Sequence, residues 1–150
     1  MWRKVWLMVA GTIITGVILT VIQGVRMDSR QKDVMEELDK ARYAFRIANN
    51  YLYCNDHTDW LVMMEQGGTV TMRFWGYHML GGIEMSIYNT EGKVYVRNEG
   101  DGPDQEFSFR LPKGTYFLTV DCSRGFLGAY AIGLENITAL RKPVPMYTKE

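Results

Sequence analysis

A run of 21 residues without a charged side chain, from Val5 to Val25, constrains this 150-residue chain more than any other feature. Lys4 precedes the run and Arg26 follows it. At 1.5 Å per residue, a helix of this length spans about 30 Å, the thickness of a bilayer's hydrocarbon core. We expect residues 1–26 to form an uncleaved transmembrane anchor, because the run is longer than a usual signal-peptide core and offers no clear small-x-small cleavage site.

The orientation of this anchor follows from several features together. Basic residues flank the run at both ends, so the positive-inside rule is nearly balanced. The short, charge-poor segment before the run favours a cytoplasmic N-terminus and an extracytoplasmic C-terminal domain. Cys54 and Cys122 are an even pair outside the run, which fits one disulfide in an oxidising compartment. Asn136 begins an Asn-Ile-Thr glycosylation sequon, which agrees with that orientation.

The charge of the chain limits its partners. The 17 Lys and Arg residues equal the 17 Asp and Glu residues, and only Arg3 and Lys4 lie before the run, which leaves the rest slightly acidic. A nucleic-acid-binding domain needs a basic patch or stripe, so we exclude nucleic acid as a partner. The partners expected are membrane lipid and other membrane or surface proteins, a second copy of this chain included.

The stretch after the anchor has a helical pattern. No Pro or Gly interrupts it, and residues 27–50 are predicted to form an amphipathic helix or stalk that continues the anchor. Its apolar residues have heptad spacing: Val34, Leu38, Ala41, Phe45 and Ala48. The seam fits either a helix that self-associates or a helix that lies on the protein's own domain. Two heptads are fewer than a coiled coil needs, which favours the second interpretation.

Small residues recur every four positions inside the run, as in helix–helix contacts within membranes. These residues are Thr12, Gly16, Thr20 and Gly24. One interpretation is a face that packs against another helix. The other is that the pattern has no such role, because Thr and Gly are common in membrane helices in general.

Residues 51–138 alternate between apolar and polar positions with a period of two, which is typical of half-buried strands. Tyr130, Ile132 and Leu134, for example, alternate with Ala131 and Gly133. Gly-, Asn- and Pro-containing turns separate the runs, and no helical pattern intervenes. We therefore predict a mainly β chain with an antiparallel jelly-roll β-sandwich of about seven to eight strands. Residues 139–150 are expected to form an extended tail.

Several strand motifs resemble a known family. They are Gly67-Gly68-Thr69-Val70, then Lys113-Gly114-Thr115-Tyr116, then Gly128-Ala129-Tyr130. Over about residues 52–136 the chain resembles the bacterial pre-peptidase C-terminal domain and is similar to Golgi-dynamics-type domains, both small jelly-roll sandwiches. The resemblance implies inward-packed tyrosines and a non-catalytic binding or accessory module outside the cytoplasm. Two departures are the absence of a protease before the sandwich and a membrane segment that precedes it.

Two groups of residues are candidates for binding. Glu99, Asp101 and Asp104 concentrate acidic oxygens in one loop, and calcium prefers such ligands, although a solvated turn is favoured because the spacing does not match an EF-hand. Aromatic residues at outward-phase positions can stack on a sugar ring or a partner protein, or be covered by the helix at 30–50. These residues are Trp75, Tyr77, Tyr88 and Tyr95.

No catalytic set emerges from the sequence. His57 and His78 lack ligand spacing, and Ser123 does not lie in a nucleophile elbow. We expect no enzyme and no cofactor, calcium excepted. The predicted function is a single-pass membrane protein that presents an extracytoplasmic binding module within a membrane or cell-surface assembly. The alternatives are a pilin-like structural subunit of a filament and a glycan-binding surface module.

Overall fold

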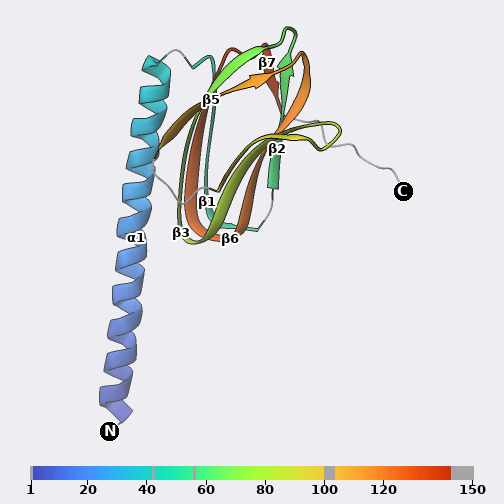
Figure 1. Cartoon of the computed structure of the whole chain (residues 1–150). Coiled ribbons are helices and arrows are strands. Elements are labelled where there is room, and N and C mark those ends of the chain that lie inside the picture. Colours follow the sequence, from blue (N-terminus) through green and yellow to red (C-terminus); the bar gives the residue numbers. More distant parts are fainter. Residues whose placement is uncertain (1, 42, 56, 100–103, 143–150) are drawn as a thin grey trace.

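The computed structural model describes residues 2–41, 43–55, 57–99 and 104–142, and within them one helix and seven strands. Helix α1 (Trp2–Lys40) stands beside the strands, and its N-terminal part projects beyond them (Figure 1). The strands are β1 (Phe45–Cys54), β2 (His57–Met64), β3 (Gly68–Asn89), β4 (Val94–Glu99), β5 (Gln105–Leu111), β6 (Gly114–Glu135) and β7 (Ala139–Arg141).

Strands β3 and β6 hold the two layers together. Each has 22 residues, and they pair antiparallel from Thr71 opposite Glu135 to Asn89 opposite Tyr116. Their shared bend lies where the register shifts between Leu80 and Gly82. Gly81 has a φ of 96°, and a Cβ there would lie 2.5 Å from the Arg124 carbonyl oxygen, so the corner requires glycine.

The bend divides the strands into two sheets. The helix-side sheet consists of β5, the first half of β3, the second half of β6, and β1. The outer sheet consists of β4, the second half of β3, the first half of β6, β2 and β7. All of these pairings are antiparallel, as the alternating sequence predicts. The predicted β-sandwich is therefore confirmed.

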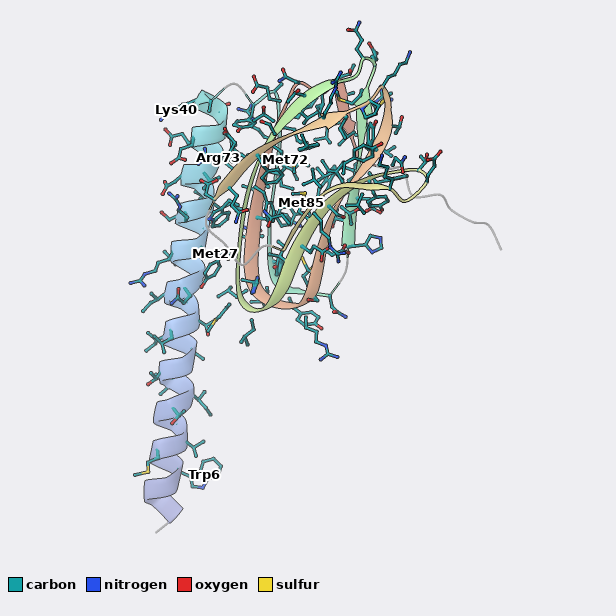
Figure 2. The ribbon with its side chains drawn as sticks, viewed as in Figure 1. Trp6, Met27, Lys40, Met72, Arg73 and Met85 are labelled. Atoms are coloured by element: carbon teal, nitrogen blue, oxygen red, sulfur yellow. The ribbon has the colours of Figure 1, made fainter. Side chains whose placement is uncertain are left out.

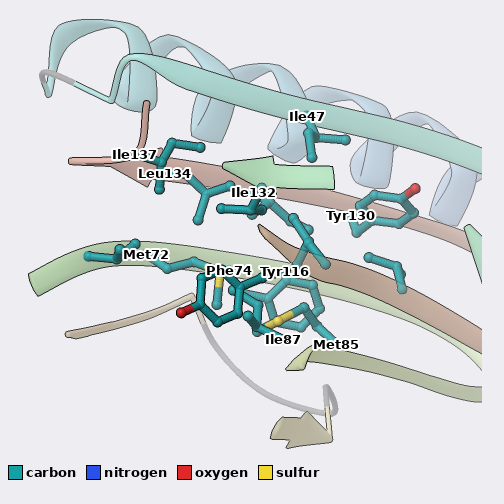
Figure 3. Close-up of a cluster of buried hydrophobic side chains, with 14 of the residues drawn as sticks. Ile47, Met72, Phe74, Met85, Ile87, Tyr116, Tyr130, Ile132, Leu134 and Ile137 are labelled. Carbon is teal, nitrogen blue, oxygen red and sulfur yellow. The ribbon is translucent and has the colours of Figure 1, made fainter. Parts of the chain in front are cut away.

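The apolar side chains of the two sheets meet in one core. Phe74, Ile132 and Leu134 come from the helix-side sheet, and Met85 and Ile87 come from the outer sheet (Figure 3). Met72 and Met85 lie inside the sandwich in Figure 2, as gap-filling residues do. The two motif tyrosines also face inward as expected: Tyr116 is 3% and Tyr130 2% exposed.

The C-terminal half of α1 packs on the helix-side sheet. Val34 and Leu38 are fully buried against the helix-side face of β6, where it carries the small residues Ala129, Ala131 and Gly133. A Cβ on Gly133 would lie 2.5 Å from Cδ2 of Leu38, so the helix sits as close as the backbone permits. Val34 and Leu38 of the predicted seam therefore contact the protein's own domain, as the second interpretation expects, whereas Ala41 is exposed.

Polar contacts fix the rotation of α1 on the sheet. The buried amide of Gln31 donates hydrogen bonds to the carbonyl oxygens of Asn49 (2.8 Å) and Tyr130 (2.9 Å), which are paired residues of β1 and β6. Arg73 of β3 lies between α1 and the sheet in Figure 2. Its guanidinium pairs with Glu37 of α1 at 2.5 Å and with the carboxylate of Asp104.

The predicted helix over residues 27–50 is wrong beyond Lys40, because β1 begins at Phe45. Phe45 and Ala48 of the heptad seam therefore lie in a strand. β-Branched Ile47 and the aromatic residues near it favour a strand. In addition, β6 pairs with β1 along its length. These two effects together outweigh the helical spacing of the apolar residues. The sandwich thus starts before residue 51, and Ala139–Arg141, predicted to lie in the tail, forms an edge strand on β2.

We predict that Gly133→Val loosens the helix. The added side chain must displace Leu38 and Tyr43, which should cost about 2 kcal/mol of stability, as overpacking typically does. Hydrogen–deuterium exchange in detergent should then rise in residues 27–38. Gly68→Val is the control, because no atom lies within 4 Å of a Cβ at Gly68. Unchanged exchange in Gly133→Val would contradict the close packing.

Candidate functional site

On the outward side of the outer sheet, side chains of neighbouring strands line up in rows that run across the strands. Glu84, Asp121 and His57 are register neighbours on β3, β6 and β2. Cross-strand neighbours on one face have Cβ atoms about 5 Å apart, so these three groups form one polar row. The adjacent row, two residues further along each strand, contains Ser86, Thr119 and Asp59.

A pocket of about 520 Å³ opens at the end of the polar row, beside the bend of β3 and β6. Glycine at position 82 leaves this hollow, since a Cβ there would come within 2.9 Å of the Ser123 hydroxyl. The pocket is lined by Asn55, His57, Gly82, Ile83, Glu84, Asp121, Cys122 and Ser123. It therefore combines carboxylate, imidazole, amide and hydroxyl groups around an open volume.

Ion pairs hold the charged groups of this face in place. Glu84 Oε1 lies 2.8 Å from Nε of Arg97, and a second Arg97 nitrogen donates to Oε2 at 2.9 Å, which is a bidentate arrangement. His57 Nε2 lies 3.4 Å from Oδ2 of Asp59. The other oxygen of Asp59 accepts a 2.7 Å hydrogen bond from the Thr119 hydroxyl.

Asp121 lies between these pairs. Burial raises the pKa of its carboxyl group above the usual value, and the neighbouring carboxylates of Glu84 and Asp59 raise it further. His57 and Arg97 act in the opposite direction. Asp121 is thus more readily protonated than an ordinary aspartate, and when protonated it can donate as well as accept a hydrogen bond.

An aromatic platform borders the polar rows. Tyr88 and Phe117 are register neighbours on β3 and β6, and their rings stack with centroids 5.4 Å apart and planes 25° apart. The Tyr88 hydroxyl lies 3.2 Å from the Thr119 hydroxyl, which links the platform to Asp59. An apolar stacking surface beside fixed hydroxyl and carboxylate groups can bind a ligand that has both an apolar face and many hydroxyl groups.

The structure separates the four aromatic residues that the sequence grouped. Trp75 is 7% exposed and Tyr77 is half-buried, and both pack in the cluster beneath α1. Tyr95 is not outward, because its ring packs edge-on against Tyr116 of the core, and β3 and β4 shift register beside it. Trp75 and Tyr77 are thus covered by the helix, which is the alternative that the sequence left open. Only Tyr88 of the four lies on the outer face, so the four do not form one exposed aromatic surface.

The predicted calcium group is described only in part. Asp104 binds the Arg73 guanidinium, Glu99 occupies a strand position opposite Glu84, and Asp101 lies outside the described residues, as does the side chain of Glu99. Within the described residues, no three His, Cys, Asp or Glu side chains are arranged to hold a metal ion.

The two cysteines lie close together and both are thiols. Cys54 ends β1, and it packs against the core cluster that contains Cys122. Burial and a hydrogen bond with Cys54 raise the pKa of the Cys122 thiol to about 12. The disulfide predicted between them stays a prediction.

The remaining predicted sites are the small-residue face of the helix and the glycosylation sequon. Thr12 and Gly16 line a shallow groove on the exposed half of α1, and the Thr20 hydroxyl bonds to the Gly16 carbonyl. Gly24 instead faces Leu127 of the sandwich. Asn136 is exposed in a turn with a φ of 63°, and its glycosylation stays a prediction.

Most residues of the outer face carry no recognisable motif in the sequence. His57 looks like an isolated turn residue in the sequence, and Glu84, Asp121 and Phe117 are far apart along the chain. The available signal was their common outward phase in three strands. The pairing of those strands, which decides which residues are neighbours, cannot be read from the alternation.

Comparison with solved structures places the sandwich among small β modules. The pre-peptidase C-terminal domain of a collagenase from Bacillus anthracis matches with a TM-score of 0.50 and 17% identity, over 61% of this chain and 88% of that one. A C-terminal family 6 carbohydrate-binding module of a Zobellia galactanivorans laminarinase matches with a TM-score of 0.40 and 11% identity, over 62% and 94%. No family model and no curated protein matches the chain.

These likenesses concern the fold. The first of them agrees with the resemblance that the strand motifs carry, since it too is a pre-peptidase C-terminal domain. The chain is therefore similar to that class of β-sandwich module, preceded here by a long apolar helix.

We predict that Asp121→Asn stabilises the protein at neutral pH. A carboxyl group whose pKa is raised by folding contributes stability at low pH, and that contribution is lost as the pH rises through the folded-state pKa. The neutral amide avoids this loss, so the variant should have the larger free energy of unfolding at pH 7. The difference should shrink below the ordinary Asp pKa of about 3.9.

Urea denaturation in detergent at pH 3 and pH 7 measures the effect. Asp33→Asn, which removes an exposed carboxylate on α1, is the control. A loss of stability in Asp121→Asn at pH 7 would contradict the electrostatic description of this face.

Proposed function

We propose that this chain is a single-pass membrane protein that presents a non-catalytic β-sandwich binding module, and that it acts as an accessory or interaction subunit of a membrane or cell-surface assembly. One observation carries the proposal. The apolar half of α1 is long enough to cross a membrane, and residues 8–19 in it are exposed throughout, whereas the other half is packed on the sandwich. Exposing apolar side chains such as Ile13, Val17 and Val21 to water is unfavourable in free energy, whereas the hydrocarbon core of a bilayer accommodates them.

The packing of α1 gives the anchor a second role. Because one unbroken helix both enters the membrane and docks on the helix-side sheet, the sandwich has a fixed orientation relative to the bilayer. The helix covers one face of the sandwich and leaves the outer sheet open. The face with the pocket is therefore the surface available for a partner.

A glycan is the ligand class that this face favours. Pyranose rings stack their C–H faces on aromatic side chains, and their hydroxyl groups bond to carboxylates and amides. Tyr88 and Phe117 offer such a surface beside Asp59, and the pocket with Glu84 and Asp121 lies further along the same sheet.

The two cysteines support an extracytoplasmic location. Their thiols lie within hydrogen-bonding reach, so oxidation would join them with little movement of β1 or β6. The reaction forms one S–S bond and passes two protons and two electrons to an oxidised dithiol of the compartment. We propose that this disulfide forms in the mature protein.

We predict that alkaline carbonate leaves the full chain in the membrane pellet, and that maleimide labels Cys54 and Cys122 only after reduction. The expected mass of the unreduced protein is about 2 Da lower, as two lost hydrogens require. Cys54→Ser is the control, since it should leave Cys122 as a thiol that labels after unfolding without reduction. Release by carbonate would contradict the anchor, and labelling without reduction would contradict the oxidising location.

We predict that Phe117→Ala and Tyr88→Ala each weaken glycan binding by about 1–3 kcal/mol, the typical effect of removing an aromatic stacking partner. Binding of the detergent-solubilised chain to a glycan array identifies the ligand, and calorimetry with that ligand measures the loss. Tyr53→Ala is the control, because it removes an exposed aromatic ring from a different part of the sandwich. An equal loss of binding in Tyr53→Ala, or the absence of any bound glycan, would contradict the glycan site. The partner would then be sought among proteins by native pull-down.

A further inference from the structure

The end of the sandwich at the bend of β3 and β6 is apolar and exposed. Leu52 and Tyr53 near the end of β1 are 67% and 65% exposed, and Met79 and Leu80 of β3 are 40% and 63% exposed. The register places Tyr53 and Leu80 on either side of position 126 of β6, so β1 and β3 bring these residues to one end. Four large apolar side chains exposed together are unusual on a surface that faces only water.

This end lies at the level where α1 would enter the membrane. Leu127, next to the bend, is buried against Met27 and faces Gly24, the next-to-last residue of the charge-free run. The turns of β3 and β6 lie beside the middle of α1, well below its C-terminal end (Figure 1). A membrane that contains the apolar half of α1 would therefore reach the exposed apolar end of the sandwich.

Basic and aromatic side chains form a pocket of about 220 Å³ directly beside this end. Arg26 and Arg30 come from α1, and Trp75 and Tyr77 come from β3, four and two residues before Met79. Within the described part of the chain, neither Arg26 nor Arg30 has an ion pair or side-chain hydrogen bond, whereas Arg73 is fully paired. Two unpaired guanidinium groups beside Trp and Tyr match the chemistry of a phospholipid headgroup region.

We propose that this end of the sandwich is a second membrane contact, in which Leu52, Tyr53, Met79 and Leu80 enter the lipid interface while Arg26 and Arg30 bind the phosphate of an acidic phospholipid. The occupant is a lipid of the bilayer that α1 spans, because the pocket is continuous with the apolar surface of α1. This inference rests on the proposed membrane anchor. It adds that the domain lies against the bilayer and prefers acidic lipid.

Photo-crosslinking tests the apolar contact. Benzoylphenylalanine replaces Leu80, Val21 or Arg110 in the full chain, which is reconstituted in nanodiscs of equal parts phosphatidylglycerol and phosphatidylcholine. We expect lipid adducts by mass spectrometry at positions 80 and 21 and none at 110. Arg110 pairs with Thr69, which lies roughly 35 Å along β3 from Leu80.

The outcomes separate the two proposals. Adducts at 21 but not at 80 would overturn the membrane contact of the sandwich and leave the anchor intact. No adduct at either position would overturn the anchor and the contact together. The position 21 side chain is exposed on α1, so its adduct reports insertion independently of the sandwich.

Lipid selectivity tests the two arginines. Native mass spectrometry of the full chain in detergent with equimolar phosphatidylglycerol and phosphatidylcholine should show retained phosphatidylglycerol. In Arg26→Gln/Arg30→Gln this retention should fall about tenfold or more, since each basic residue at a membrane surface contributes measurably to binding acidic lipid. Arg110→Gln/Lys113→Gln loses the same charge at exposed positions far from the pocket, and it should retain lipid as the wild type does.

Equal loss in both double variants would overturn the site, because it would indicate attraction by net charge alone. Competition by soluble glycerol 3-phosphate would point to a free phosphate ligand and would equally overturn the assignment to a bilayer lipid. A shared thermal unfolding temperature of the variants and the wild type confirms that the sandwich is folded in each case.

Discussion

The packing of α1 on the small-residue face of β6 is the contact on which the rest of the molecule depends. Ala129, Ala131 and Gly133 bring the helix close to the sheet, and the buried amide of Gln31 bonds to two strand carbonyls. A buried amide whose nitrogen donates two hydrogen bonds to strand carbonyls fixes a helix in one rotation, because another rotation leaves those polar groups without partners. The direction of the membrane segment relative to the sandwich follows from this contact.

The same contact explains how the two surfaces of the sandwich differ. Beneath α1, Trp75 and Tyr77 lose most of their contact with water and fill the space beside the helix. On the outer sheet no element covers the strands within the described residues, so the Asp121 carboxylate and the half-buried stacked pair of Tyr88 and Phe117 lie at the surface, beside the buried Ser86 and Thr119. One side of the module thus serves to anchor it, and the other offers a binding surface.

The corner where β3 and β6 bend connects the anchor to the binding face. Gly81 permits the backbone conformation, and Gly82 leaves room for the pocket on the outer side. The same corner also exposes Met79 and Leu80. A single structural irregularity therefore borders both a polar hollow and an exposed apolar end of the sandwich.

The sequence by itself determined the local features of this protein. A charge-free run of 21 residues can only be a long apolar helix, and alternation with period two predicts half-buried strands, since both depend on periodicities of the backbone. The inward position of Tyr116 and Tyr130 follows in the same way. The tertiary structure alone decided where α1 ends, that Tyr95 faces the core, and that His57, Glu84 and Asp121 are neighbours. Those outcomes depend on strand pairing and register between distant segments. Alternation predicts which face of the sheet a residue lies on, but it does not predict which residue is its neighbour on the next strand.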